Sequence, residues 1–454
     1  MPEADNIPEA TALPAGGVAF AHSEARAPGR ELHDLVAELY PLCRSITGDG
    51  VRETLARLGR IVPLATHALP SGTPVLDWTI PPEWNIRDAW IADRHGRRVV
   101  DFRRSNLHVV GYSVPVRRRM SLAELRPHLH TLPGQPDWIP YRTSYYKEDW
   151  GFCLSQRALE ALPEGDYEVC IDATLTPGEL VYGEALVRGA TDEEIFVSCH
   201  ICHPSLANDN LSGVAVAAHL AREVGSRPRR YTYRFVFVPG TIGAIAWLSR
   251  NAAILPRIRH GLVLSCLGDA GPLTYKRSRR GDSAIDGAAA RVLRAHGPHR
   301  ILPFSPDGYD ERQYCSPGFD LPVGRLSRSP AGTFPEYHTS ADDLSLVSPD
   351  HLAASLAACR DIFAALEGER FFVNRSPYGE PQLGRRGLYR ALGGEVRRDR
   401  LEAAILWVLN LADGRHGLTD IAERAGLPVT EIEAAAATLI AHGLIEETAG
   451  ALRT

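Results

Sequence analysis

The sequence has no apolar run of the ~18–20 residues that a membrane helix needs, which predicts a protein without membrane spans. Its N-terminus, MPEADNIPEATALPAGG, has neither the basic start nor the apolar stretch of a secretory signal, so we expect a cytoplasmic protein. It also lacks a charge excess: 50 basic and 55 acidic residues give a net charge of −5, which excludes a general attraction to nucleic acids or anionic membranes. The 454 residues, 44% hydrophobic and 23% charged, are typical of a globular protein with about three domains.

Cysteine is sparse, with eight residues spread through the chain. In a long chain without an export signal, we interpret them as reduced thiols rather than as a disulfide framework. Only Cys199 and Cys202 have C-x-x-C spacing, and the second such pair that a structural zinc ribbon needs is missing. A thioredoxin-type redox pair stays open as an alternative.

Changes in composition predict the domain organisation. Residues 1–30, rich in Pro, Ala, Gly and Glu, are typical of a mobile tail. Residues 78–189 hold five of the seven tryptophans and several short β-type runs, which predict an inserted β-rich domain. We expect residues 31–77 and 190–375 to form one α/β domain around this insertion. Three helical patterns after Leu401, the last two joined by a Gly-containing turn, predict a winged-helix domain over 376–454.

Within the α/β region, short apolar runs alternate with segments of helix length. The expected strands are 194–199, 233–239, 261–267 and 321–327, and the expected helices are 213–224, 244–255 and 286–296. Strands without polar alternation, separated by helices, indicate a mostly parallel sheet that is covered on both faces. Ligands of such sheets bind at the carboxyl ends of the strands. Candidate functional residues are therefore sought there.

The first candidates follow the strand at 194–199. His200 comes directly after it, and Asp209 lies in the loop that opens the next helix. An imidazole and a carboxylate at one sheet edge are suitable zinc ligands, and Asn208 and Asn210 could orient the carboxylate. The alternative is that Asp209 only caps a helix and that His200 is a structural polar residue.

Further polar residues follow the other strands, which strengthens the metal hypothesis. They are Asp269 after the strand at 261–267, Asp310, Glu311 and Arg312 in a later loop, and Glu336, His338, Asp342 and Asp343 in FPEYHTSADDL.

These motifs also carry a family resemblance. HICHPSLANDNLSG and the downstream YHTSADD resemble the zinc aminopeptidase and glutaminyl cyclase superfamily. LYPLCRSITGDGVRETL, PPEWNIRDAWI, TYKRSRRG and YDERQYCSPGF resemble its bacterial aminopeptidase-like subgroup, over about residues 32–450. The resemblance implies an α/β fold: a mostly parallel-sheet zinc exopeptidase-like core with an inserted β-rich domain and a C-terminal winged helix.

The resemblance also implies a ligand set. His200 would bind one metal ion, Asp209 would bridge, and His338 would bind the other. Asp269 lies close to where the family has a further carboxylate, and Cys266 is a competing candidate for that role. Cys202 stands in place of the Asp of the family's His-x-Asp motif, and its neighbour His203 is an additional, lower-ranked candidate ligand.

One departure from the family pattern concerns the Glu pair that provides a general base and a metal ligand. The matching segment, FVFVPGTIG, has Pro239 and Gly240 instead. Two divalent ions close together need several anionic ligands to offset about four positive charges. We therefore expect one tightly bound zinc ion, with the second site weak or empty.

The missing base leads to Glu311 as the predicted catalytic residue, with Glu336 as second choice. Arg312 could bind a substrate carboxylate, and Lys276 and Arg280 in TYKRSRRG could hold an anionic substrate. The alternatives are a surface Glu311–Arg312 pair worth at most ~1 kcal/mol and a solvated basic face in TYKRSRRG.

The net negative charge of the C-terminal region disfavours nucleic acid as a partner. From Leu401 to Thr454 there are three basic residues against eight acidic ones, and VTEIEAAAATLIA has no Lys or Arg. Because DNA affinity comes mostly from neutralised phosphates, we interpret this domain as a packing or protein-interaction module.

Together these observations predict a zinc-dependent hydrolase of an amide bond in a small peptide or an aminoacyl or acyl conjugate. The alternative is a peptidase-fold protein that has lost catalysis and binds a metabolite or a protein partner. A metabolite-responsive transcription regulator is a third hypothesis, resting on the winged helix alone. The sequence leaves the oligomeric state open, and a homo-oligomer is compatible with it.

Overall fold

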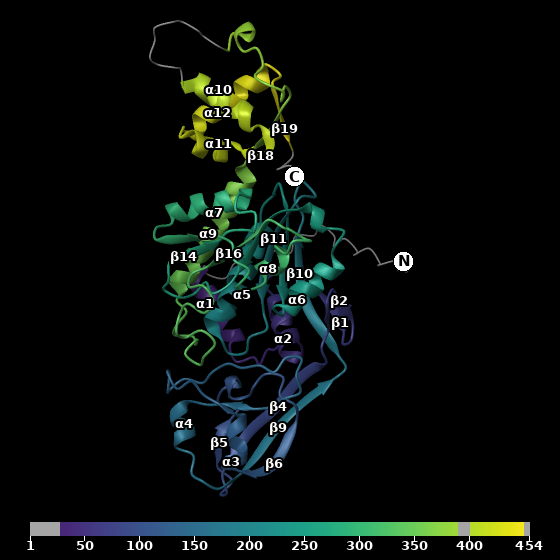
Figure 1. Ribbon diagram of the computed structural model, residues 1–454, viewed down its shortest axis with the longest axis vertical. Helices are drawn as coiled ribbons and strands as arrows, with labels where there is room; N and C mark the ends of the chain where they lie inside the picture. The colour runs from purple at the N-terminus through teal and green to yellow at the C-terminus, as the bar shows by residue number, and fades with distance from the viewer. Residues whose placement is uncertain (1–27, 389–399, 449–454) are drawn as a thin grey trace.

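The computed structural model describes residues 28–388 and 400–448, which form an elongated molecule in three parts (Figure 1). The α/β part lies in the middle, the inserted sheet at one end and the C-terminal helices at the other. Most of the tail predicted at 1–30 lies outside the described residues. Its last three residues belong to helix α1 (Pro28–Leu39). This helix begins with a proline, whose missing N–H costs nothing at a helix start.

The central sheet has eight strands and confirms the predicted α/β class. In sheet order these are β1 (Ala65–Pro70), β10 (Glu179–Val187), β12 (Thr232–Val238), β11 (Glu194–His200), β13 (Ile258–Leu264), β16 (Val323–Ser327), β14 (Leu273–Lys276) and β15 (His299–Leu302). The middle strands β12, β11, β13 and β16 are parallel neighbours. Their carboxyl ends therefore meet at one edge of the sheet, as predicted.

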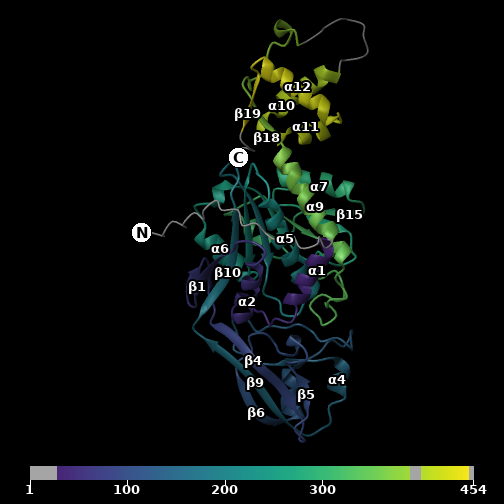
Figure 2. The same cartoon turned by 180° about the vertical axis from the view of Figure 1, so that it is seen from behind.

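Helices cover both faces of this sheet (Figure 2). They are α1, α2 (Asp49–Leu58), α5 (Gly213–Val224), α6 (Ile242–Arg250), α7 (Ala284–Ala295), α8 (Glu311–Tyr314) and α9 (Pro349–Gly368). Alternate residues of β11 enter two different cores: Ile195 and Val197 pack with α1, α5 and α9, whereas Phe196 packs with α6 and Trp247. This two-sided burial explains why residues 195–197 of β11 are apolar without alternation.

The inserted region forms a separate four-stranded antiparallel sheet. Its strands, in sheet order, are β5 (Arg98–Asp101), β4 (Glu83–Ala92), β9 (Asp166–Thr176) and β6 (Val116–Ser121). Two short helices accompany it, α3 (Leu122–Leu125) and α4 (Gln156–Glu160). Two short strand pairs lie nearby in the sequence, β2 (Pro74–Val75) with β3 (Trp78–Thr79) and β7 (Leu129–His130) with β8 (Phe152–Cys153). Strand β10 lies inside the stretch predicted as the insertion, yet it pairs with β1 and β12 of the central sheet. A β-type run does not reveal which sheet it joins, because strands of either sheet have the same local pattern.

The C-terminal part has the predicted winged-helix elements. They are α10 (Arg400–Leu411), α11 (Leu418–Ala425), α12 (Val429–Ala441), and the strands β17 (Phe371–Asn374), β18 (Asp413–Gly417) and β19 (Ile445–Thr448). Strand β17 pairs with both β18 and β19, so this sheet begins before the boundary predicted at residue 376.

Two global expectations can be compared with these elements. All eight cysteines are described and free, which agrees with the prediction of reduced thiols. Within the described residues, no helix combines the length and the apolar character required to cross a membrane.

Candidate metal centre

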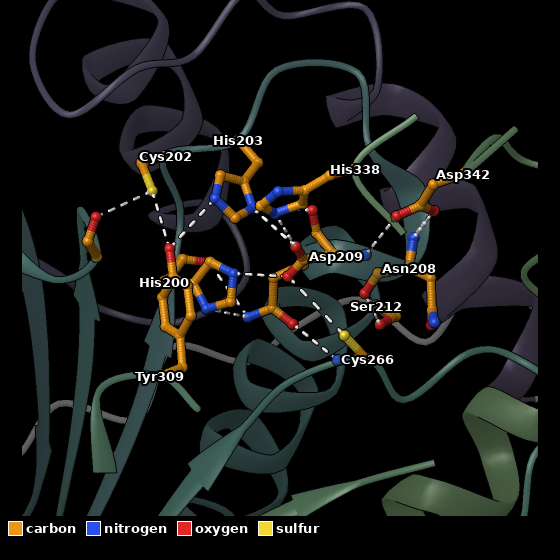
Figure 3. Close-up of polar contacts among 12 residues, drawn as sticks. His200, Cys202, His203, Asn208, Asp209, Ser212, Cys266, Tyr309, His338 and Asp342 are labelled. Atoms are coloured by element: carbon orange, nitrogen blue, oxygen red, sulfur yellow. Dashed lines mark hydrogen bonds and ion pairs between the residues drawn. The ribbon is translucent and has the colours of Figure 1, made fainter. Parts of the chain in front are cut away.

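The candidate site lies at the carboxyl edge of the central sheet. His200 is the last residue of β11, and the buried turn η3 (Ala207–Ser212) carries Asp209 back over the same edge. His338 reaches this edge from the loop between β16 and α9. Three residues separated by up to 138 positions therefore converge (Figure 3), and the strand-end rule accounts for His200 and Asp209.

The carboxylate of Asp209 is the centre of the cluster. Its Oδ1 lies 2.9 Å from Nε2 of His200, and its Oδ2 lies 2.9 Å from Nε2 of His338. Nδ1 of His203 is 3.2 Å from Oδ2. Asp209, His200 and His203 are buried, while the side chain of His338 is 32% exposed and connects the cluster with solvent.

The electrostatics of the cluster favour an ionised carboxylate. Burial alone would raise the pKa of Asp209, but the charge of His203 and the hydrogen bonds of the imidazoles hold it well below its usual range. Burial lowers the pKa of His200 to about 4, against the opposing effect of Asp209. The result is a buried anion beside a neutral imidazole nitrogen, both of which are donors for a divalent cation.

Two further carboxylates hold the turn that presents Asp209. Asp342 accepts hydrogen bonds from the backbone N–H groups of Asn208 (2.6 Å) and Asp209 (2.9 Å). Asp269 accepts from the side-chain amide of Asn208 at 2.8 Å and from the hydroxyl of Ser329 at 2.6 Å. Both carboxylates support the turn behind Asp209.

Asp269, which was predicted as a ligand, therefore lies behind the turn that carries Asp209 and not beside the imidazoles. The competing candidate Cys266 is closer, because its Sγ lies 3.8 Å from Oδ1 of Asp209. The reason is register: β13 ends at Leu264, so residue 266 stands at the sheet edge, whereas residue 269 has already turned behind the Asp209 loop.

The donor set fits a metal ion. Potential ligand atoms of His200, His203 and Asp209 all lie within 4.8 Å of one another, and His338 touches the same carboxylate. Imidazole nitrogens and one carboxylate, with a buried thiol beside them, match the preferences of zinc rather than those of magnesium or calcium.

A pocket of about 360 Å³ opens next to the cluster. Its lining includes His203, His338 and a wall of aromatic side chains, namely Trp78, Tyr141, Tyr145, Tyr146 and Tyr309. The ring of Tyr141 meets the rings of His203 and His338 edge to face, at 5.2 and 5.1 Å between centroids. Most of this wall comes from the inserted region, which therefore contributes to the site directly.

The insertion is also joined to the loop of His338. The N–H of Tyr141 donates to the carbonyl of His338 at 2.8 Å, and Ser340 N–H donates to the carbonyl of Ile139 at 2.8 Å. These bonds hold His338 in a backbone conformation with φ 57°, which non-glycine residues rarely adopt.

Tyr309 is a site residue that sequence reasoning missed. Its ring lies against that of His200, with 3.7 Å between centroids and a tilt of 30°, and its hydroxyl lies 3.2 Å from Nε2 of His203. The only signal was its position in YDERQY, directly before the acidic residues that drew attention.

The other predicted residues are placed differently. Glu311, the predicted base, is fully buried, with Oε1 2.6 Å from Nζ of Lys276 and 3.2 Å from Nη1 of Arg325. Lys276 is thereby engaged with Glu311 instead of facing a substrate. Arg280 pairs with Asp320 at 3.1 Å, and Arg312 is exposed. None of these three cations lines the pocket beside the imidazoles.

Comparisons with known proteins agree with this geometry. Residues 33–369 match the family described as "Domain of unknown function (DUF4910)", and residues 370–447 match a winged helix-turn-helix family. A protein of Clostridium acetobutylicum, provisionally named as a polysaccharide biosynthesis protein with an aminopeptidase-like domain, is 48% identical over 412 residues, which are 90% of this chain and 95% of that protein.

Solved structures extend the comparison. A Clostridium acetobutylicum crystal structure, provisionally described as a peptidase, is 46% identical and has a TM-score of 0.80, covering 92% of this chain and 96% of that one. A zinc aminopeptidase from Bacillus subtilis has a TM-score of 0.54 at 14% identity, covering 76% of this chain and 96% of that one, and shares the fold alone. These similarities confirm the predicted aminopeptidase-like fold and the C-terminal winged helix.

Proposed function

Because the chain belongs to the DUF4910 family, whose relatives have an aminopeptidase-like fold, we propose that it is a zinc-dependent hydrolase of an amide bond. The substrate would be a small peptide or an aminoacyl or acyl conjugate. The observation that carries this proposal is the ionised carboxylate of Asp209, buried among imidazoles at the mouth of an aromatic pocket.

The ligands in this proposal are His200, Asp209 and His338, with His203 and Cys266 completing the set. Zinc bound there would supply Lewis acidity to the amide carbonyl and to water. We propose one tightly bound ion, with a second site weak or empty, because Asp209 is the one carboxylate that contacts these imidazoles in the described residues. One carboxylate and one thiolate would offset only two of the about four positive charges of two divalent ions.

The pocket supports an uncharged, partly apolar substrate group. Its walls are aromatic rings together with Ile46, Ile242 and Ile245, and its volume of about 360 Å³ suits one bulky side chain or acyl group. A carboxylate-binding role for Lys276, Arg280 and Arg312 finds no support in their placement. The relative's provisional name makes an acylated amino sugar a reasonable member of the substrate panel.

The placement of Glu311 gives no support to its predicted role as the proton acceptor. Its carboxylate is fully buried and paired with Lys276 and Arg325, and it does not line the pocket. Asp310 is also fully buried, but both of its carboxylate oxygens lack a hydrogen-bond partner among the described residues. Burial raises the pKa of Asp310 to about 8, but Asp310 does not line the pocket either.

A second candidate function is binding without catalysis, as sequence reasoning anticipated. Gly240 provides no carboxylate, and Glu311 is engaged in ion pairs. In that case the cluster would hold zinc as a structural or ligand-binding ion.

One experiment separates the two. The purified protein is stripped with a chelator, reconstituted with zinc, and assayed for metal content and for cleavage of amides with apolar, aromatic and acetylated-sugar groups. We expect about one zinc per chain, hydrolysis only in the reconstituted protein, and loss of both properties in His338→Ala. Zinc binding without any turnover would favour the binding function, and absence of zinc after reconstitution would remove both.

A further inference from the structure

Tyr309 occupies the space that a side chain at position 240 would need. A Cβ added to Gly240 would overlap Cε1 of Tyr309 and would lie 2.8 Å from its hydroxyl oxygen. Any residue larger than glycine at 240 therefore excludes the present position of Tyr309. Because residue 240 in FVFVPGTIG is a glycine, the side chain of Tyr309, which comes from a distant loop, can lie beside the site.

The side chain of Tyr309 is fixed at both of its ends. Its ring lies on the ring of His200, with 3.7 Å between centroids. Its hydroxyl lies 3.2 Å from Nε2 of His203 and 3.6 Å from Sγ of Cys202 (Figure 3). A hydroxyl that is held this way and also lines the pocket has a defined position relative to any ligand bound there.

The direction of its hydrogen follows from His203. Nδ1 of His203 faces the carboxylate of Asp209 at 3.2 Å, so this nitrogen points at the candidate cation site. If Nδ1 binds a cation, the ring proton must be on Nε2, where it donates to the oxygen of Tyr309. The O–H of Tyr309 then donates either to Sγ of Cys202, a weak acceptor 3.6 Å away, or to a stronger oxygen acceptor bound in the pocket.

We propose that Tyr309 is a catalytic residue whose O–H donates a hydrogen bond to the carbonyl oxygen of the scissile amide. The inference rests on the proposed amide hydrolysis and adds a specific donor to it. A fixed donor aimed at the oxygen on which negative charge develops contributes about 10²–10³-fold to kcat in enzymes of acyl transfer. Such a donor acts in the transition state, so its loss should lower kcat much more than it changes KM.

The test compares Tyr309 with a tyrosine outside the pocket. Tyr309→Phe removes only the hydroxyl and keeps the ring on His200. Tyr167→Phe is the control, because the hydroxyl of Tyr167 donates to the carbonyl of Pro163 (2.7 Å) and Tyr167 does not line the pocket. At saturating zinc, we expect about a 100-fold lower kcat with little change in KM for Tyr309→Phe, and at most a threefold change for Tyr167→Phe.

Zinc affinity, measured by competition with a coloured chelator, separates this role from a structural one. Loss of the partner of His203 should weaken zinc binding about tenfold. A Tyr309→Phe protein with weaker zinc binding but wild-type kcat at saturating zinc overturns the proposal, because the tyrosine would then only position His203. A wild-type protein that binds zinc but cleaves no amide overturns the proposed function, and this inference with it. Activity lost only in Tyr309→Phe supports both.

Gly240 provides an independent second measurement. Gly240→Ala should displace Tyr309 and lower kcat to a similar extent, whereas the same change in a Tyr309→Ala background should have no further effect, because the space is then empty. Equal losses from Gly240→Ala in the two backgrounds would contradict the proposed exclusion between positions 240 and 309.

Discussion

Asp310 and Glu311 are adjacent in the chain, yet replacing each by its amide should change the free energy of unfolding in opposite directions. Both are fully buried carboxyl groups. Glu311 has two cationic partners, Lys276 and Arg325, whereas neither oxygen of Asp310 has a hydrogen-bond partner in the described part of the chain. Replacing each by its amide therefore removes a well-compensated charge in one case and an uncompensated one in the other.

For Asp310, burial raises the pKa from 3.8 to about 8, with a further contribution from Glu311. A carboxyl group whose pKa is raised on folding contributes stability below its unfolded pKa and loses it as the pH rises towards the folded pKa. At pH 7, about three pH units above 3.8, the cost is on the order of 4 kcal/mol. Asp310→Asn should remove this cost.

The assay is urea unfolding of the metal-free protein at pH 5, 6 and 7. We expect the free energy of unfolding of Asp310→Asn to exceed that of the wild type, by a margin that grows by roughly 3 kcal/mol from pH 5 to pH 7. The exposed Asp282→Asn is the control and should show a constant difference near zero.

Glu311→Gln should behave in the opposite way. It leaves Lys276 and Arg325 buried without their anion, which costs roughly 3–5 kcal/mol. The reasoning about the uncompensated carboxyl is refuted if the difference in unfolding free energy between Asp310→Asn and the wild type is independent of pH. It is also refuted if Asp310→Asn is less stable than Glu311→Gln at pH 7.

Three further predictions concern other parts of the molecule. Cobalt(II)-loaded protein should show a thiolate-to-cobalt absorption band that is lost in Cys266→Ser; the same band in the variant would exclude Cys266 as a ligand. Gly240→Glu should destabilise the protein and should not increase activity, since its side chain would overlap Tyr309; a more active and equally stable variant would contradict this packing. Burial, with the nearby Arg230 and Arg259, lowers the pKa of His260 to about 3, so its contribution to stability is lost as the pH falls below ~6.5. Between pH 7 and pH 5 the wild type should lose roughly 2 kcal/mol more stability than His260→Phe, measured by urea unfolding, and equal losses would refute this.

The sequence was sufficient to predict the fold and the core of the candidate site. Apolar runs without alternation identified the parallel strands, and a rule about strand ends then selected His200 and Asp209 from many polar residues. His338 needed the family resemblance in addition, because no strand directly precedes it in the sequence. The three residues are in contact in the structure, but metal binding by them stays a prediction.

The rest depended on distances that a sequence does not contain. Glu311 and Arg312 are adjacent in the chain, yet one is fully buried and the other is exposed. The partner of Glu311 is Lys276, from a strand 35 positions earlier, and this pairing is not visible as a local pattern. Asp269 and Cys266 differ by three residues, and only the end of β13 determines which of them faces Asp209.

The same limit applies to the aromatic wall. Tyr141 and Tyr309 reach the cluster from separate regions of the chain, and only the fold shows that both contact His203. Neither has a spacing that distinguishes it from an ordinary core tyrosine, so composition alone could not have selected them.

The bonds between residues 139–141 and 338–340 have a consequence for the order in which a growing chain completes its centre. The ribosome adds His338 after 129 further steps beyond Asp209, which takes roughly 6–26 s at 5–20 residues per second. The segment 139–141, which bonds to the loop of His338, is synthesised before Asp209. During biosynthesis, His200, His203 and Asp209 are therefore made before His338, so the cluster described here is complete only after this late segment is synthesised.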